Sequence, residues 1–129
     1  TSTFAVTLHN EVFSCGWNRC GENAVGHRKS TRHMRRVIFN SLNSCSPNHY
    51  QSKDGNNHEN GIVMISGGAG SFIVLDENET AYSSGSNRCN LICLGKECTE
   101  SVSLSQICSF RRVKCMTTGY LHSLFAVEF

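Results

Sequence analysis

Residues 72–75 form an apolar run, Phe-Ile-Val-Leu, which is followed by a polar turn at residues 76–79. Because the side chains of a strand alternate between two faces, a run that is apolar at every position needs both faces of its sheet covered. Residues 80–84, Thr-Ala-Tyr-Ser-Ser, then return as a second strand. The pattern therefore predicts a hairpin in the interior of an all-β protein.

The same order of strand, turn and glycine-marked loop recurs along the chain. The first two copies carry glycine and asparagine at equal spacing after the second strand of each hairpin: Gly16 with Gly85, Asn18 with Asn87, and Gly26 with Gly95. A third, partial copy aligns residues 119–127 with residues 67–75. Three alignments in the same order indicate an internal repeat of roughly 50–70 residues, a period in the range of propellers and solenoids.

The repeat divides the chain into a copy at about residues 3–70, a copy at about 71–122 and the start of a third at 113–129. Residues 40–60 are rich in Asn, Ser and His and lengthen the first copy, which predicts an exposed insertion loop. Further short strands are expected at residues 37–39, 62–65 and around 102–107, and no segment carries helix caps and a helical period.

Two motifs carry a resemblance to a known family. Residues 13–26 read Phe-Ser-Cys-Gly-Trp-Asn-Arg-Cys-Gly-Glu-Asn-Ala-Val-Gly, and residues 119–127 read Gly-Tyr-Leu-His-Ser-Leu-Phe-Ala-Val. They resemble the repeat of the RCC1 (regulator of chromosome condensation) family, in which Gly-x-x-His-Ser precedes one strand and Tyr-Ser-Trp-Gly-x-Asn follows in the next. The positions that match this repeat, all expected to be structural, are Gly16, Asn18, Gly21, Gly26, Gly67, Gly85, Asn87, Gly95, Gly119 and His122.

The resemblance implies RCC1-like β-propeller blades, with departures where Gly70 replaces the histidine and Cys15 and Ser84 replace the tryptophan. Members of the family form seven-bladed propellers that bind proteins, and some are guanine-nucleotide exchange factors for small GTPases. Two repeats cannot close a propeller, which has typically 4–8 blades. We therefore expect an incomplete propeller whose open edges meet remaining blades or a second copy. The partner implied by the resemblance is a protein, with a small GTPase as the first candidate.

A basic segment at residues 28–36 contains five of the twelve Lys and Arg residues. Clustered guanidinium groups suit phosphate groups and acidic protein surfaces, whereas the simpler interpretation is a solvated loop between strands. The formal charge of +2 and the lack of aromatic residues within the segment give chromatin or nucleic acid weaker support than a protein partner. The residues proposed to bind a partner, in this segment and in the insertion, are Arg28, Lys29, Arg32, Arg35, Arg36, His49, Tyr50 and Lys53.

Eight cysteines leave a second class of function open. Cys89, Cys93 and Cys98 approach the spacing of zinc ligands, but no second pair completes the set, and disulfides with a glycosylated Asn78 would fit an exported protein. The alternative is therefore a cysteine-rich, disulfide- or zinc-stabilised extracellular binding module. Because buried free cysteines behave as small hydrophobes, the favoured interpretation is free thiols in an intracellular protein, cytoplasmic or nuclear, with no metal or cofactor.

An enzyme is the least supported class, because no residues assemble a nucleophile, a base and an orienting group. His122 is expected to be structural, near a blade interior, and the neighbouring Ser123 lacks the glycine pattern of a nucleophile elbow. Asp76, Glu77 and Glu79 are expected to form a solvated hairpin tip rather than a pair of catalytic carboxylates. At most, the resemblance implies nucleotide exchange, which needs no catalytic side-chain chemistry.

Overall fold

The computed structural model describes residues 1–40 and 60–128. His49, Tyr50, Lys53 and nearly all of the predicted 40–60 insertion lie outside the described residues, so their proposed role stays a prediction.

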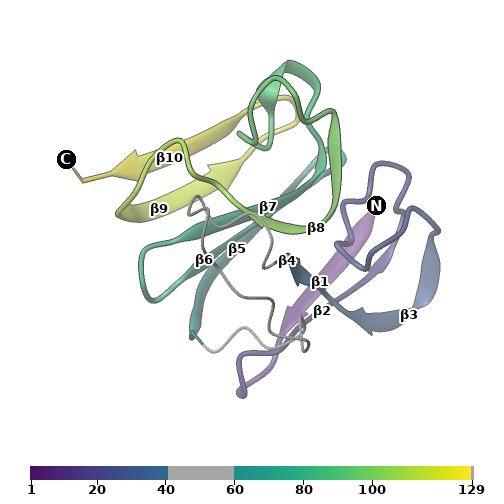
Figure 1. The fold of residues 1–129 in the computed structure, drawn as a ribbon. Coiled ribbons are helices and arrows are strands. Elements are labelled where there is room, and N and C mark those ends of the chain that lie inside the picture. Colours follow the sequence, from purple (N-terminus) through teal and green to yellow (C-terminus); the bar gives the residue numbers. More distant parts are fainter. Residues whose placement is uncertain (41–59, 129) are drawn as a thin grey trace.

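Within the described residues, ten strands form three sheets (Figure 1). The first sheet has the order β1 (Ser2–Val6), β2 (Val12–Gly16) and β3 (Thr31–Arg36). The central sheet has the order β4 (Phe39–Asn40), β8 (Glu100–Gln106), β7 (Ala81–Ser86), β6 (Ser71–Asp76) and β5 (Ile62–Gly68). The third sheet is a hairpin of β9 (Val113–Thr118) and β10 (Ser123–Val127). The fold is all-β, as predicted, and the described residues include one short 3-10 helix, η2 (Arg88–Asn90).

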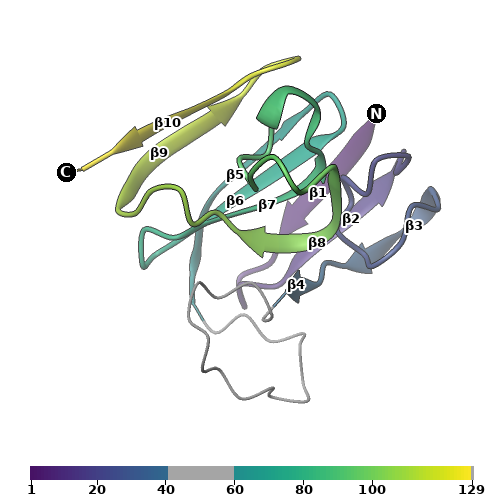
Figure 2. The same cartoon turned by 45° about the horizontal axis from the view of Figure 1, so that its top comes forward.

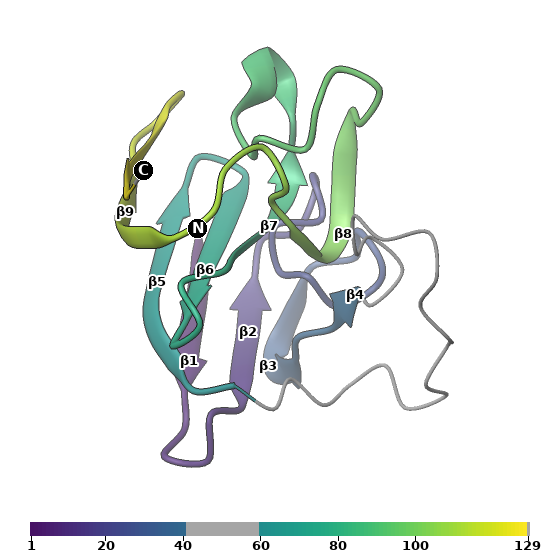
Figure 3. The same ribbon diagram turned by 60° about the vertical axis from the view of Figure 1, so that its left-hand side comes forward.

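The central sheet lies between the other two (Figures 1, 2 and 3), and its strand β6 is buried at every position. Phe72 and Val74 belong to a core shared with the first sheet, whereas Ile73 and Leu75 belong to a second core shared with the β9–β10 hairpin. The prediction that the apolar run has both of its faces covered is therefore confirmed. Among the described residues, no helix is long and apolar enough to cross a membrane.

The strand pairings show the repeat directly. Ser2 pairs with Gly16 in the first hairpin as Ser71 pairs with Gly85 in the central sheet. Each pair is the last of its hairpin, so the first two copies share one register. Equal registers place the loops that follow β2 and β7 at equivalent positions of their sheets, which is what the glycine and asparagine spacing predicted.

The partial third copy is shifted by one residue from the predicted alignment. The amide of Gly119 donates to the carbonyl of His122 at 2.8 Å across the turn between β9 and β10, and Gly68 pairs with Ser71 across the corresponding turn of the central sheet. Gly119 therefore corresponds to Gly68, one residue after the predicted position. The histidine position of the repeat is then held by Ser71 in the central copy, not by Gly70.

Three local predictions have different outcomes. The basic segment 28–36 is not wholly a loop, because Thr31–Arg36 forms strand β3 of the first sheet. The strand predicted at residues 37–39 is reduced to β4, which pairs in parallel with β8. The outer strand predicted around residues 102–107 is confirmed as β8, which joins β7 to β4.

Candidate functional site

The basic segment lies on the exposed outer edge of the first sheet. β3 pairs with β2 on one side only, and all its residues after Thr31 are exposed. Arg28 and Lys29 lie in the loop directly before β3, so the structure brings together the five basic residues that the sequence singled out. Charged side chains on an edge strand also prevent pairing with strands of other chains. We call Arg28, Lys29, Arg32, Arg35 and Arg36 the basic edge.

Two side chains of the basic edge have acidic partners. Nη1 of Arg28 lies 3.0 Å from Oε1 of Glu100, and Nη2 of Arg36 lies 3.4 Å from Oε1 of Glu11. Both pairs are solvent-exposed, so each contributes little to stability. The members of the basic edge that form no ion pair with any described residue are Lys29, Arg32 and Arg35.

The loop that carries Arg28 and Lys29 is held in place by the buried side chain of Asn18. Its Nδ2 donates to the carbonyls of His27 and Lys29 at 2.6 and 3.2 Å, and its Oδ1 accepts the amide of Asn23 at 2.9 Å. A buried amide that satisfies three backbone groups fixes the path of the chain around it. The backbone that precedes β3 is therefore ordered before any partner arrives.

Asn87 makes the equivalent contacts in the second copy. Its Nδ2 donates to the carbonyls of Gly95 and Cys98 at 2.8 and 2.7 Å, and its Oδ1 accepts the amide of Ile92 at 3.2 Å. The repeated asparagine therefore closes the loop after the second strand in both copies. This gives Asn18 and Asn87 a positioning role, whatever the loops bind.

Gly16 and Gly85 end the second strand of each copy with the same backbone, at a φ of +106° in both. A methyl group at Gly85 would lie 2.1 Å from the carbonyl oxygen of Gly70, and one at Gly16 would lie 2.5 Å from that of Thr1. Glycine adopts positive φ without strain and lets the two backbones meet. These glycines shape the start of the loops that the asparagines close.

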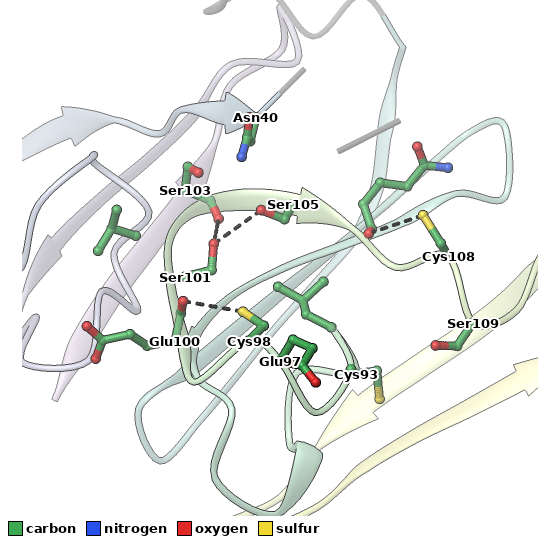
Figure 4. Close-up of a pocket in the computed structure, with 14 residues that line it drawn as sticks. Asn40, Cys93, Glu97, Cys98, Glu100, Ser101, Ser103, Ser105, Cys108 and Ser109 are labelled. Carbon is green, nitrogen blue, oxygen red and sulfur yellow. Dashed lines mark hydrogen bonds between the residues drawn. The ribbon is translucent and has the colours of Figure 1, made fainter. Parts of the chain in front are cut away.

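An open pocket of about 720 Å³ lies beside β8 (Figure 4). Oγ of Ser101 donates to the carbonyl of Ser103 at 2.7 Å and lies 3.2 Å from Oγ of Ser105. The thiol of Cys98 donates to the carbonyl of Glu100 at 3.4 Å. These polar groups satisfy one another, and the described residues contain no cluster of His, Cys, Asp and Glu placed to hold a metal ion.

Most of the cysteines that the structure describes are unpaired. Those that are free in the described part of the chain are Cys15, Cys20, Cys89, Cys93, Cys98 and Cys115. Cys108 is disulfide-bonded, which departs from the favoured interpretation that every thiol is free. Burial raises the pKa of the Cys93 thiol. The pKa of the Cys20 thiol is also raised, mainly by burial and to a smaller extent by the negative charges of Glu22 and Glu100. A raised pKa keeps a thiol protonated at neutral pH, so neither is an activated nucleophile.

The carboxylate of Asp76 is buried, not at a solvated tip as predicted, because only 1% of the residue is exposed. Its Oδ1 accepts the amides of Asn78 and Thr80 at 3.0 and 2.9 Å, and its Oδ2 accepts Nδ2 of Asn60 at 3.1 Å. Burial, together with the charge and hydrogen bond of Asp76, raises the pKa of Tyr82 to about 12. The signal that the sequence reasoning missed was an aspartate at a strand end, where such a side chain binds turn amides.

His122 is exposed on the β9–β10 hairpin and does not lie near a blade interior. A methyl group at Gly119 would lie 2.4 Å from its ring, so the glycine makes room for the imidazole. The amide of Gly119 donates to the carbonyl of His122 at 2.8 Å, so the contacts of this histidine are those of the turn between β9 and β10.

No protein-family model and no curated protein matches the sequence. Among solved structures, the chain superposes on Prp20p from Saccharomyces cerevisiae with a TM-score of 0.78 at 15% identity, covering 98% of this chain and 29% of that one. For yeast RCC1 (Prp20) bound to Kap60, the TM-score is 0.73 at 16% identity, with 98% and 28% covered. For human WBSCR16, it is 0.70 at 12% identity, with 92% and 26% covered.

The chain therefore has an RCC1-like fold, that of an incomplete β-propeller, as the resemblance implied. It spans less than a third of each of these structures. A likeness at such low identity establishes the fold alone, and function has to be argued from the site.

Proposed function

We propose that this chain is a protein-interaction module of an RCC1-like propeller, and that its basic edge binds an acidic surface of a small GTPase. The observation that carries the proposal is a set of three cations on that edge, Lys29, Arg32 and Arg35, that form no ion pair with any described residue. Their backbone is fixed by Asn18 and by the pairing of β3 with β2. Preorganised charge lowers the ordering cost of binding and steers an acidic partner toward the site.

The comparisons support a protein as the partner. Prp20p has been studied for its binding to Gsp1p and histones, and yeast RCC1 has been seen bound to Kap60. The family that the sequence resembles includes guanine-nucleotide exchange factors, which makes a small GTPase the first partner to test. Nucleotide exchange is the finer part of the proposal, and a GTPase partner would place the protein inside the cell, in the cytoplasm or nucleus.

Charge reversal of the basic edge tests the proposal. We would immobilise the chain and measure binding of a panel of small GTPases, each with GDP and without nucleotide, by surface plasmon resonance. The double variant Arg32→Glu with Arg35→Glu should weaken binding at least about tenfold, and the loss should shrink at high salt. The matched control is Arg111→Glu, an exposed arginine between β8 and β9.

Three results would count against the proposal. Binding that survives the double reversal, or that Arg111→Glu weakens equally, would remove the basic edge as the contact. If no GTPase binds while histones or duplex DNA bind with a steep salt dependence, the partner class would be chromatin.

A further inference from the structure

A second site lies where turns and loops from all three sheets come together. It is a cavity of about 550 Å³ that contains no residue of the basic edge. Its walls come from three separate places in the chain: Trp17 and Glu22 in the loop after β2, the turn between β5 and β6, and Tyr120 in the turn between β9 and β10. Because all three sheets contribute, the cavity exists only in the folded arrangement.

The one charged side chain among the residues that line this cavity is that of Glu22, and this residue is only 5% exposed. Its Oε2 accepts the amide of Cys20 at 2.9 Å, and its backbone carbonyl accepts Oγ of Ser84 in the central sheet at 3.2 Å. None of the ion pairs among the described residues includes Glu22. A buried charge is costly unless an opposite charge compensates it, so the carboxylate favours a cationic occupant.

Two aromatic residues also line the cavity and are exposed, Trp17 at 49% and Tyr120 at 76%. The backbone of Trp17 is fixed, because its amide donates to the carbonyl of Thr1 at 2.9 Å and its carbonyl accepts Oγ of Ser2 at 2.7 Å. The guanidinium of Arg19 already lies 4.8 Å from the centre of the indole. The ring therefore accommodates a guanidinium in this environment, as electron-rich aromatic faces do.

We infer that this cavity binds an arginine side chain presented by a partner protein. The guanidinium would pair with the Glu22 carboxylate and stack against the exposed rings of Trp17 and Tyr120. Arginine fits better than lysine because its planar group combines forked hydrogen bonding with stacking. The inference does not depend on the basic edge or on a GTPase, because it concerns other residues and a ligand of the opposite charge.

The fluorescence of Trp17, the only tryptophan of the chain, gives a direct readout. The probe is a blocked pentapeptide, Gly-Gly-Arg-Gly-Gly, titrated at constant ionic strength. The comparison peptides carry citrulline, which keeps the shape and removes the charge, or lysine, which keeps the charge and removes the fork. We expect saturable binding of the arginine peptide, at least about tenfold tighter than either comparison peptide. Amide resonances of residues 67–71 should shift in the same titration.

Two variants locate the site. Glu22→Gln keeps an oxygen for the amide of Cys20 and should weaken the arginine peptide at least about tenfold, whereas Glu97→Gln, at an exposed carboxylate, should have no effect. Tyr120→Ala should weaken binding, whereas Leu121→Ala, its exposed neighbour outside the cavity, should not. An unchanged thermal midpoint shows that each variant is folded.

The inference is overturned if the citrulline or lysine peptide binds as tightly as the arginine peptide, or if folded Glu22→Gln binds it normally. Binding that Arg32→Glu with Arg35→Glu abolishes would also overturn it, because it would place the peptide on the basic edge. Failure of the GTPase experiment leaves these outcomes unchanged, so the two proposals fail separately.

Discussion

The rings of Phe4 and Phe72 stack with their centroids 3.8 Å apart and their planes 8° from parallel. Phe4 belongs to β1 and Phe72 to β6, so this contact joins the first sheet to the central one. Both residues belong to or pack against the same hydrophobic core. The junction between two neighbouring sheets therefore rests on a direct aromatic contact in addition to aliphatic packing.

Replacing Phe4 by alanine should weaken this junction. The change removes the stacked ring and leaves a gap beside Phe72, so we expect the free energy of unfolding to fall by about 2–3 kcal/mol. Urea denaturation monitored by circular dichroism measures it. Leu8→Ala is the control, because Leu8 is fully exposed in the turn after β1 and should change stability by less than about 0.5 kcal/mol. Equal effects of the two substitutions would show that the stack is not what holds the sheets together.

Two glycines with similar backbones should respond differently to alanine. Gly85 and Gly95 have φ values of +106° and +85°, but a methyl at Gly85 would meet Gly70 at 2.1 Å, whereas nothing lies within 4 Å of a methyl at Gly95. Gly95→Ala should cost about 1–2 kcal/mol of backbone strain. Gly85→Ala should cost more, because the strand pairing must also shift. Thermal unfolding of the two variants checks the order, and a larger loss at Gly95 would contradict the steric argument.

The loop-closing role of Asn18 predicts a local effect. Asn18→Ala removes the donor for the carbonyls of His27 and Lys29 and the acceptor for the amide of Asn23, so we expect a loss of about 2–3 kcal/mol. The amide of Asn23 should exchange with solvent faster than in the wild-type chain, while amides of β6 keep their relative protection. Asn87→Ala is the matched variant, and it should affect Ile92 instead. Exchange that rises uniformly over the chain would argue against a local clamp.

Much of this fold follows from local sequence pattern, and the reason is visible at particular residues. The doubly apolar strand at Phe72 and the spacing shared by Asn18 and Asn87 depend on short-range periodicity, which a sequence displays directly. The turn contacts of Asp76 follow from its position at a strand end, whereas its burial depends also on Asn60 and on the sheet around it. The cavity of Trp17, Glu22 and Tyr120 was missed for the same reason, since only tertiary packing brings three distant turns together.

High pH should destabilise the chain through Tyr82. Burial and the Asp76 carboxylate raise the pKa of this phenol to about 12, from about 10 in an unfolded chain. Between these values the unfolded state has lost the proton that the folded state retains, so stability falls as pH rises from about 10 to 12. In urea titrations, the free energy of unfolding of Tyr82→Phe should fall less steeply over that pH window than that of the wild-type chain. Parallel curves of stability against pH for the wild-type chain and Tyr82→Phe would contradict the raised pKa. The control is Tyr120→Phe, which changes an exposed tyrosine.

The one-residue correction to the third copy makes Leu124 of β10 the counterpart of Ile73 of β6. Ile73 is fully buried against the β9–β10 hairpin, whereas Leu124 is 61% exposed, because the described residues include no sheet beyond it. Ile73→Ala should therefore cost about 3 kcal/mol in the isolated chain and Leu124→Ala less than about 0.5. Remaining blades or a second copy covering this face would raise the cost at Leu124 toward that at Ile73. Urea titrations of both variants at several protein concentrations separate the cases. If the free energy of unfolding that Leu124→Ala removes depends on protein concentration, a second copy covers this face. If Leu124→Ala lowers the free energy of unfolding strongly at every concentration, the exposed position of Leu124 is contradicted.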